Sequence, residues 1–160
     1  MNIKTLQVGW VVFLLGVVNL AAGSNLQLVD AVKEGDHTAV RSLLGDEADV
    51  NVRPAYGTTV LAWAANRNDL EMVELLIEAG AGVNVADVYG VTALSLACTN
   101  GNAAMVAKLL AARADPKLAQ VTGETPLMTC TRTGSAEAAS PFWSSGRMPT
   151  PGKVSGARRL

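Results

Sequence analysis

The residues that could carry chemistry are few, because the chain has one histidine and two cysteines among its 160 residues. His37 directly follows Asp36, and no second histidine or nearby cysteine gives it the ligand spacing of a zinc site. We therefore expect His37 to be a surface residue and not a metal ligand. A nucleophile formed by a cysteine and His37 is not supported either, because Cys98 and Cys130 lie far from it along the chain.

The two cysteines could instead form a disulfide, as cysteines do in an oxidising compartment. We expect Cys98 and Cys130 to lie on short helices of neighbouring structural units. Packed helices lie about 8–10 Å apart axis to axis, whereas a disulfide needs Cα atoms within about 7 Å of each other. We therefore expect two free or partly buried thiols, with a disulfide as the alternative.

Two short stretches resemble ligand-binding loops only loosely. Gly80–Gly82 is too short for a phosphate-binding loop and is not expected between a strand and a helix. Asp46, Glu47 and Asp49 lack the glycine and the terminal glutamate of a calcium-binding loop. We therefore expect no catalytic site, no metal and no cofactor. The net charge of −1 gives no strong electrostatic argument for a nucleic-acid partner.

The elements that must position any functional side chain recur at a fixed step of 33 residues, the interval from Leu28 to Leu61. A period in this range indicates a repeat architecture. Like residues fall into register in many rows, among them Leu28, Leu61, Leu94 and Leu127; Ala31, Ala64, Ala97 and Cys130; Val40, Val73 and Val106; and Gly57, Gly90 and Gly123. The apolar spacing predicts a short first helix and a longer amphipathic second helix in each unit.

The turn between the two helices has its own signature. Each turn begins with a residue type that tolerates a left-handed backbone just past a helix end. These residues are Gly35, Asn68, Gly101 and Gly134. The next position always holds a residue type that favours the N-cap of a helix. These residues are Asp36, Asp69, Asn102 and Ser135.

These rows resemble the ankyrin repeat. Thr59–Leu61, Thr92–Leu94 and Thr125–Leu127 resemble the family's Thr-Pro-Leu opening, and Gly80–Asn84 and Ala48–Asn51 resemble its Gly-Ala-Asp-Val-Asn loop. The resemblance covers residue 25 to about residue 138. It implies an all-α fold, an α-solenoid of about three and a half repeats. The units are residues 25–57, 58–90 and 91–123, with a partial fourth unit over residues 124–138 inside a repeat domain of residues 24–138.

The chain departs from the family pattern at two places. The family's histidine after Thr-Pro-Leu is replaced by Ala62, Ser95 and Met128, so we expect less rigid repeats. Pro116 and Lys117 replace the Val-Asn of the third loop, so its conformation is the least well defined by the sequence.

Residues 1–23 have the pattern of a secretory signal peptide, with Lys4 before an apolar stretch and small residues before Ser24. We therefore expect cleavage before Ser24 and export, to the periplasm or beyond in a bacterial source. The alternative is a retained signal anchor. The apolar stretch is about 15 residues long, whereas a membrane span needs about 20.

Residues 139–160 are rich in Pro, Gly, Ser and Arg, which is typical of a disordered basic tail. The period, however, places a second helix there. Shifting the reading frame back by one base from about Ser140 forces leucine at position 143 and alanine at position 149, in register with the repeat. We hypothesise that the tail is a frameshift product of a longer array, with a natural divergent tail as the alternative.

Without that second helix, the first helix of the fourth unit would lose part of its cover. Stacked repeats are stabilised by their neighbours, and about three are needed. We therefore expect marginal stability. We expect a monomer, with self-association through the uncapped C-terminal repeat as an alternative.

The resemblance implies protein–protein recognition through the concave face and no catalytic activity. Ankyrin arrays contact partners with their loop tips and the outer positions of their first helices. The residues at those positions are Arg53, Tyr56, Trp63, Arg67, Asp87, Tyr89 and Asn100. Trp, Tyr and Arg are common interface anchors. The alternative for Trp63 is packing between first helices, as for Leu96 in the same position one unit later.

We therefore expect a non-catalytic module that binds an unidentified protein. One alternative is a membrane-tethered scaffold whose N-terminal segment is retained. Another is an enzyme that uses Cys98 or Cys130.

Overall fold

A computed structural model describes residues 23–54 and 57–146. These residues contain helices and no strand. Residues 23–34 are helical. The helices that follow are α2 (His37–Gly45), α3 (Val60–Asn66), α4 (Leu70–Glu78), α5 (Ala93–Thr99), α6 (Ala103–Ala111), α7 (Pro126–Arg132) and α8 (Ala136–Ser144). The predicted leader up to residue 22 lies outside the described residues, and so does the tail from residue 147.

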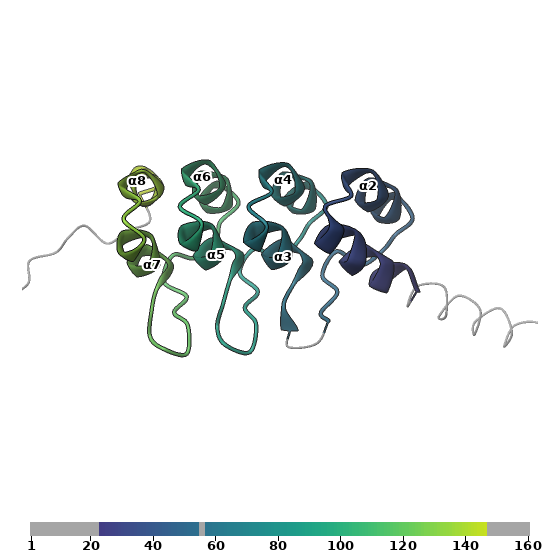
Figure 1. The fold of residues 1–160 in the computed structure, drawn as a ribbon, viewed down its shortest axis with the longest axis horizontal. Helices are drawn as coiled ribbons and strands as arrows, with labels where there is room; N and C mark the ends of the chain where they lie inside the picture. The colour runs from purple at the N-terminus through teal and green to yellow at the C-terminus, as the bar shows by residue number, and fades with distance from the viewer. Residues whose placement is uncertain (1–22, 55–56, 147–160) are drawn as a thin grey trace, which may run out of the picture.

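The helices form two parallel rows, with long loops projecting on one side only (Figure 1). The row beside the loops contains the first helices α3, α5 and α7, and the other row contains the second helices α2, α4, α6 and α8. Within each row, α3 packs on α5 and α5 on α7, and α4 packs on α6 and α6 on α8. This is the expected all-α solenoid.

The predicted caps explain where the helices begin. Asp69, for example, accepts a hydrogen bond from the Met72 amide at 3.0 Å and so occupies one of the free N–H groups that open α4. Asn68, just before it, has a left-handed backbone with φ of 60°. All eight residues of the two turn rows behave as predicted. Positive φ is found at Gly35, Asn68, Gly101 and Gly134, and N-caps at Asp36, Asp69, Asn102 and Ser135.

The core lies between the two rows of helices and runs along the solenoid. Leucines of the first helices, such as Leu61 and Leu94, are buried against second-helix residues such as Val73 and Val106. The small residues Ala64 and Ala97 are also fully buried. Because alanine takes up little room, neighbouring first helices can approach closely at this row.

The fourth unit differs from the prediction. It has a second helix, α8, which packs on both α6 and α7, so the expectation of an uncovered first helix was wrong. The proposed start of the tail at residue 139 falls inside this helix. Phe142 explains the helix, because its side chain is fully buried. Burial of one aromatic ring contributes enough to offset part of the cost of Pro141 within the helix.

The missing histidine is partly replaced in the third unit. Ser95 donates a hydrogen bond from its hydroxyl to the Thr92 carbonyl at 2.8 Å, and that hydroxyl accepts one from the Thr92 amide at 3.0 Å. The Thr92 hydroxyl accepts in turn from the Ser95 amide at 3.2 Å. This reciprocal pair is a capping box, and it fixes the start of α5 without a histidine.

Candidate functional site

A groove on the loop side of the solenoid brings two of the predicted recognition residues together. Trp63 of α3 and Asp87 of the following loop both line it. The groove has a volume of about 160 Å³. Its other lining residues, which the prediction did not include, are Thr58, Ala62, Asn66, Val91 and Leu96. The lining therefore mixes apolar surface with an amide, a hydroxyl and a carboxylate, as is common in sites that bind protein segments.

Trp63 both packs against the core and lines the groove. Its side chain is half-buried and packs against the core, as does Leu96 one unit later. The ammonium of Lys33 lies 5.1 Å from the centre of the indole ring, close enough for a cation–π contact. The indole Nε1 is buried and has no hydrogen-bond partner among the described residues. The position of the ring is therefore fixed by Lys33 on one side and by the core on the other.

Asp87 shapes the loop that forms one wall of the groove. Its carboxylate accepts hydrogen bonds from the amides of Tyr89 and Val91, both at 2.9 Å. The carbonyl oxygen of Tyr89 accepts a bond of 2.9 Å from the amide of Val121 in the next loop. The Tyr89 side chain is 57% exposed, so a rigid backbone presents this ring to solvent.

Two further apolar side chains lie at the tips of the same loops. Val88 is 61% exposed and Val121 is 73% exposed. Together with Tyr89 they form an apolar tip surface, which we define by these three residues. The prediction missed the two valines because it favoured aromatic and charged residues, although loop-tip positions carrying large apolar side chains were visible in the sequence.

Arg67 and Asn100 occupy equivalent positions one unit apart, and both bond to the preceding unit. Arg67 donates a hydrogen bond of 2.7 Å to the carbonyl of Lys33, and Asn100 donates one of 2.8 Å to the carbonyl of Ala65. Thr133, the next residue in this row, donates a bond of 3.2 Å to the carbonyl of Cys98. The side chains at this position therefore join neighbouring units, because they donate hydrogen bonds to carbonyls at the ends of the first helices.

Arg53 also contacts the next unit, through a hydrogen bond of 3.4 Å from its guanidinium to the carbonyl of Ala86. The structure does not bring Arg53, Arg67 and Asn100 into the groove that Trp63 and Asp87 line. Tyr56 lies outside the described residues, so its expected part in partner binding stays a prediction.

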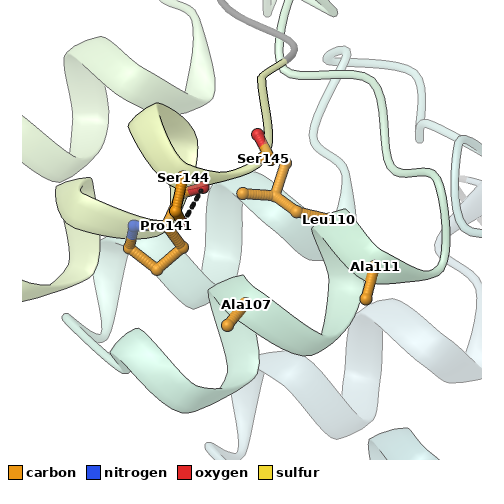
Figure 2. Close-up of a pocket in the computed structure, with 6 residues that line it drawn as sticks. All are labelled: Ala107, Leu110, Ala111, Pro141, Ser144 and Ser145. Carbon is orange, nitrogen blue, oxygen red and sulfur yellow. Dashed lines mark hydrogen bonds between the residues drawn. The ribbon is translucent and has the colours of Figure 1, made fainter.

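A second groove lies between α6 and α8 (Figure 2). Figure 2 shows Pro141, Ser144 and Ser145 of the α8 segment facing residues of α6. The lining consists of Ala107, Leu110, Ala111, Pro141, Ser144 and Ser145. None of these side chains titrates or has the chemistry of a nucleophilic site with a neighbouring base.

His37 is paired more closely than a plain surface histidine. Its Nε2 donates a hydrogen bond of 2.7 Å to the carboxylate of Asp69, and its Nδ1 lies 3.4 Å from Glu71. Arg41 binds the same Glu71 carboxylate at 3.0 Å. The hydrogen bond to Asp69 is the main cause that raises the pKa of His37; burial opposes it as the next largest effect, and the negative charges of Asp69 and Glu71 add to the rise.

The pKa of Asp69 moves the other way. Partial burial alone would raise it, but the hydrogen bonds from His37 and from the Met72 amide outweigh burial and lower the pKa of this carboxyl. The result is an ion pair between the first and second units, with Asp69 also capping α4.

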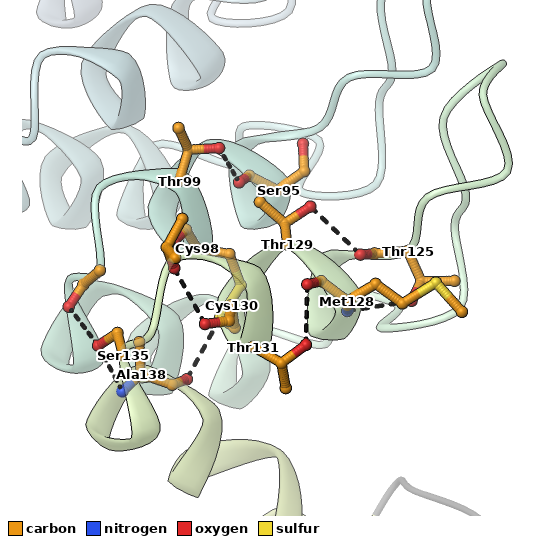
Figure 3. Close-up of a disulfide and its surroundings, with 12 residues drawn as sticks. Ser95, Cys98, Thr99, Thr125, Met128, Thr129, Cys130, Thr131, Ser135 and Ala138 are labelled. Carbon is orange, nitrogen blue, oxygen red and sulfur yellow. Dashed lines mark hydrogen bonds between the residues drawn. A yellow bond between two sulfur atoms is a disulfide. The ribbon is translucent and has the colours of Figure 1, made fainter.

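Cys98 and Cys130 form a disulfide, which corrects the expectation of two free thiols (Figure 3). The expectation used the general spacing of helix axes, but the Cα atoms of these two residues are only 4.4 Å apart. Helices α5 and α7 pack directly on each other, and the two cysteines meet across this junction. Both cysteines are fully buried, so neither presents a nucleophile to solvent.

Within residues 23–54 and 57–146, no group of three or more His, Cys, Asp and Glu side chains could hold a metal ion. In the same part of the chain no helix has both the length and the apolar character that a membrane crossing requires. A family model described as ankyrin repeats (3 copies) matches residues 28–120. No curated protein matches the chain.

Proposed function

The chain belongs to the ankyrin repeat family, and we propose that it is a non-catalytic module whose loop-side groove binds a segment of one protein partner. Ankyrin repeats are in general protein-interaction modules. The observation that carries the proposal is the position of Trp63 and Asp87 in one groove. A large aromatic ring beside polar groups is the usual composition of an interface anchor point.

The groove is well suited to binding because its walls are held in place before a partner arrives. The ammonium of Lys33 lies over the ring of Trp63, and the carboxylate of Asp87 accepts hydrogen bonds from two amides of its own loop. Side chains that are already ordered lose little conformational entropy on binding. We infer that the partner places an apolar side chain between Trp63 and Leu96.

The tip surface of Val88, Tyr89 and Val121 extends the contact area beyond the groove. These side chains are exposed, and the hydrogen bond between the Val121 amide and the Tyr89 carbonyl fixes their loops relative to each other. We assign Arg53, Arg67 and Asn100 a mainly structural role, because each is bonded to a neighbouring unit. Their contribution to partner binding should therefore be small.

Photo-crosslinking tests this proposal and isolates the partner in the same experiment. A photoreactive phenylalanine analogue is placed at Val88 on the loop side, and in a second variant at Lys108, on the row of second helices. Incubation with an extract of the source organism should give a discrete crosslinked protein from position 88 only. Equal crosslinking from both positions, or from position 108 only, would contradict a loop-side site.

We also propose that the protein is exported and acts as a monomer. Two observations support export: the leader pattern of residues 1–23, and the Cys98–Cys130 disulfide, since disulfides persist in oxidising compartments. N-terminal sequencing of the mature protein tests it. Ser24 as the first residue supports export after cleavage, whereas Met1 supports the membrane-tethered scaffold.

A further inference from the structure

The disulfide occupies a particular place in the repeat. Cys98 lies on α5 of the third unit, and Cys130 lies on α7 of the fourth. They are 32 residues apart, one less than the period of 33 that relates Leu94 to Leu127. Residues a full period apart hold the same position and point the same way. The offset of one residue instead pairs a side chain that faces the next unit with one that faces the preceding unit.

The same pair of positions occurs at each junction between units. At the first junction it holds Val32 and Ala64, and at the second it holds Ala65 and Ala97. All four side chains are fully buried, like the cysteines. At this pair of positions the two earlier junctions therefore have apolar side chains, whereas the junction between the third and fourth units has a covalent bond.

Several contacts around the disulfide come from the fourth unit (Figure 3). The Thr133 hydroxyl bonds to the carbonyls of both cysteines, at 3.2 Å to Cys98 and at 2.9 Å to Cys130. The Cys130 sulfur lies 3.5 Å from the carbonyl oxygen of Ala138 at the start of α8. The disulfide thus lies where α5, α7 and α8 meet.

Two features of the fourth unit make this link important for its stability. Among the described helices, α7 and α8 pack on α5, α6 and each other, and so have neighbours on one side only. Helix α8 also carries Pro141, which removes one backbone hydrogen bond from it. In stacked repeats, stability comes largely from the junctions with neighbouring units. A unit with one junction and an interrupted helix should open more easily than an inner unit with two junctions.

We propose that the Cys98–Cys130 disulfide is a redox-controlled staple that keeps the fourth unit docked on the third. Reduction would release α7 and α8 while the second and third units stay folded. The reductant is a small-molecule thiol, of the glutathione or dithiothreitol class. One thiolate attacks a cysteine sulfur and breaks the S–S bond, and a second thiolate resolves the mixed disulfide. Two electrons and two protons give two cysteine thiols, and the reductant becomes a disulfide.

Burial links this chemistry to the opening of the unit. Both cysteines have no solvent-exposed surface, so the thiolate can reach them only after the structure packed around the disulfide opens locally. The oxidised protein should therefore react slowly with the reductant. Once the disulfide is reduced, no covalent bond holds the fourth unit on the third.

Hydrogen exchange of the purified full chain, oxidised and then reduced with dithiothreitol, tests the staple. Reduction should speed exchange of the α7 and α8 amides by about a hundredfold, with α3 and α4 amides unchanged. The double variant Cys98→Ala, Cys130→Ala is the matched control, because alanine is the residue that the chain has at Ala65 and Ala97. It should exchange like the reduced wild type and show no response to dithiothreitol.

Three outcomes would overturn the proposal. The first is equal exchange of α7 and α8 in the oxidised and reduced wild type. The second is a reduction effect spread evenly over α3 to α8. The third is alkylation of both cysteines in air-purified protein that has been denatured without reductant. The wild-type comparison needs no substitution, so the test holds even if the alanine variant fails to fold.

Discussion

The guanidinium of Arg67 donates a hydrogen bond of 2.7 Å to the carbonyl oxygen of Lys33, at the end of the first helix of the preceding unit. A second bond, of 3.4 Å, reaches the carbonyl of Glu34. One side chain thus satisfies two carbonyls that have no partner within their own helix. The ammonium of the same Lys33 lies over the ring of Trp63, so the contacts that join the first two units also help to position Trp63 in the groove.

Substitution of Arg67→Ala should lower the free energy of unfolding by about 1 kcal/mol, because two helix-end carbonyls lose a charged donor. The matched control is Arg53→Ala, which removes a single contact of 3.4 Å and should have a smaller effect. Urea denaturation with an unchanged m-value measures both. A larger loss for Arg53→Ala would show that the junction does not depend on Arg67.

Gly90 and Gly123 hold the same position one unit apart and both have positive φ, 78° and 81°. A Cβ at Gly90 would lie 2.8 Å from the Cα of Gln120, whereas one at Gly123 would meet nothing within 4 Å. Gly123→Ala should cost about 1 kcal/mol for the backbone alone. Gly90→Ala should cost about 1–3 kcal/mol more, for the clash between loops. Equal losses in thermal denaturation would contradict the close approach of the two loops.

The His37–Asp69 pair should make stability depend on pH. Because folding raises the pKa of His37, its contribution is complete below 6.5 and is lost as pH rises through the raised value. Because folding lowers the pKa of Asp69, its contribution is present above 3.8 and is lost as pH falls through the lowered value. The pair is therefore strongest between these limits.

Denaturation of the wild type and of His37→Gln at pH 5.5 and pH 8.5 measures this effect. The wild type should exceed the variant more at pH 5.5 than at pH 8.5. Asp69→Asn is the matched control, since asparagine keeps the N-cap, as Asn102 does one unit later. It should remove most of the pH-dependent difference. An identical pH profile for the wild type and His37→Gln would show that the pair contributes nothing.

Pro141 should weaken α8, because it lacks the amide that would bond to the carbonyl of Glu137. The Ser140 hydroxyl donates a bond of 2.8 Å to that carbonyl and offsets part of the loss. Pro141→Ala should therefore stabilise the protein by about 1–3 kcal/mol. Pro126→Ala is the control, since Pro126 opens α7, where proline is favourable, and should give no gain. A Pro141→Ala variant less stable than the wild type in thermal denaturation would contradict this expectation.

The sequence alone was sufficient to predict the repeat, the turns and the caps, because these depend on contacts between residues close together in the chain. Asn68 and Asp69 illustrate this, since a left-handed residue followed by an N-cap is a local signal. The contacts between units were harder to predict. Arg67 and Asn100 were expected to bind a partner, which stays a prediction. Their hydrogen bonds to the preceding unit, a feature shared with Thr133 in the same row, were not predicted.

The two corrections have a common physical cause, since packing between distant residues outweighed a local rule. From an average helix spacing, Cys98 and Cys130 were predicted to be free thiols, but α5 and α7 pack so closely at this point that their Cα atoms are 4.4 Å apart. Pro141 and the surrounding composition predicted a disordered tail. Burial of Phe142 favours helix α8 there. The groove itself was not predicted. Its lining includes Trp63 and Asp87, which the sequence analysis had named as candidate partner-binding residues, and also Val91 and Leu96, which it had not.

The most direct test of the proposed recognition site is the dissociation constant of the crosslinked partner for Trp63→Leu and for Lys108→Ala. Leucine is the residue at the equivalent position 96, so Trp63→Leu keeps the packing and removes the indole. Lys108→Ala breaks only its exposed ion pair with Glu74, on the second helices. Trp63→Leu should weaken binding at least about tenfold, as loss of an interface anchor does, and Lys108→Ala should leave it unchanged. Unchanged binding for a folded Trp63→Leu variant would contradict the site.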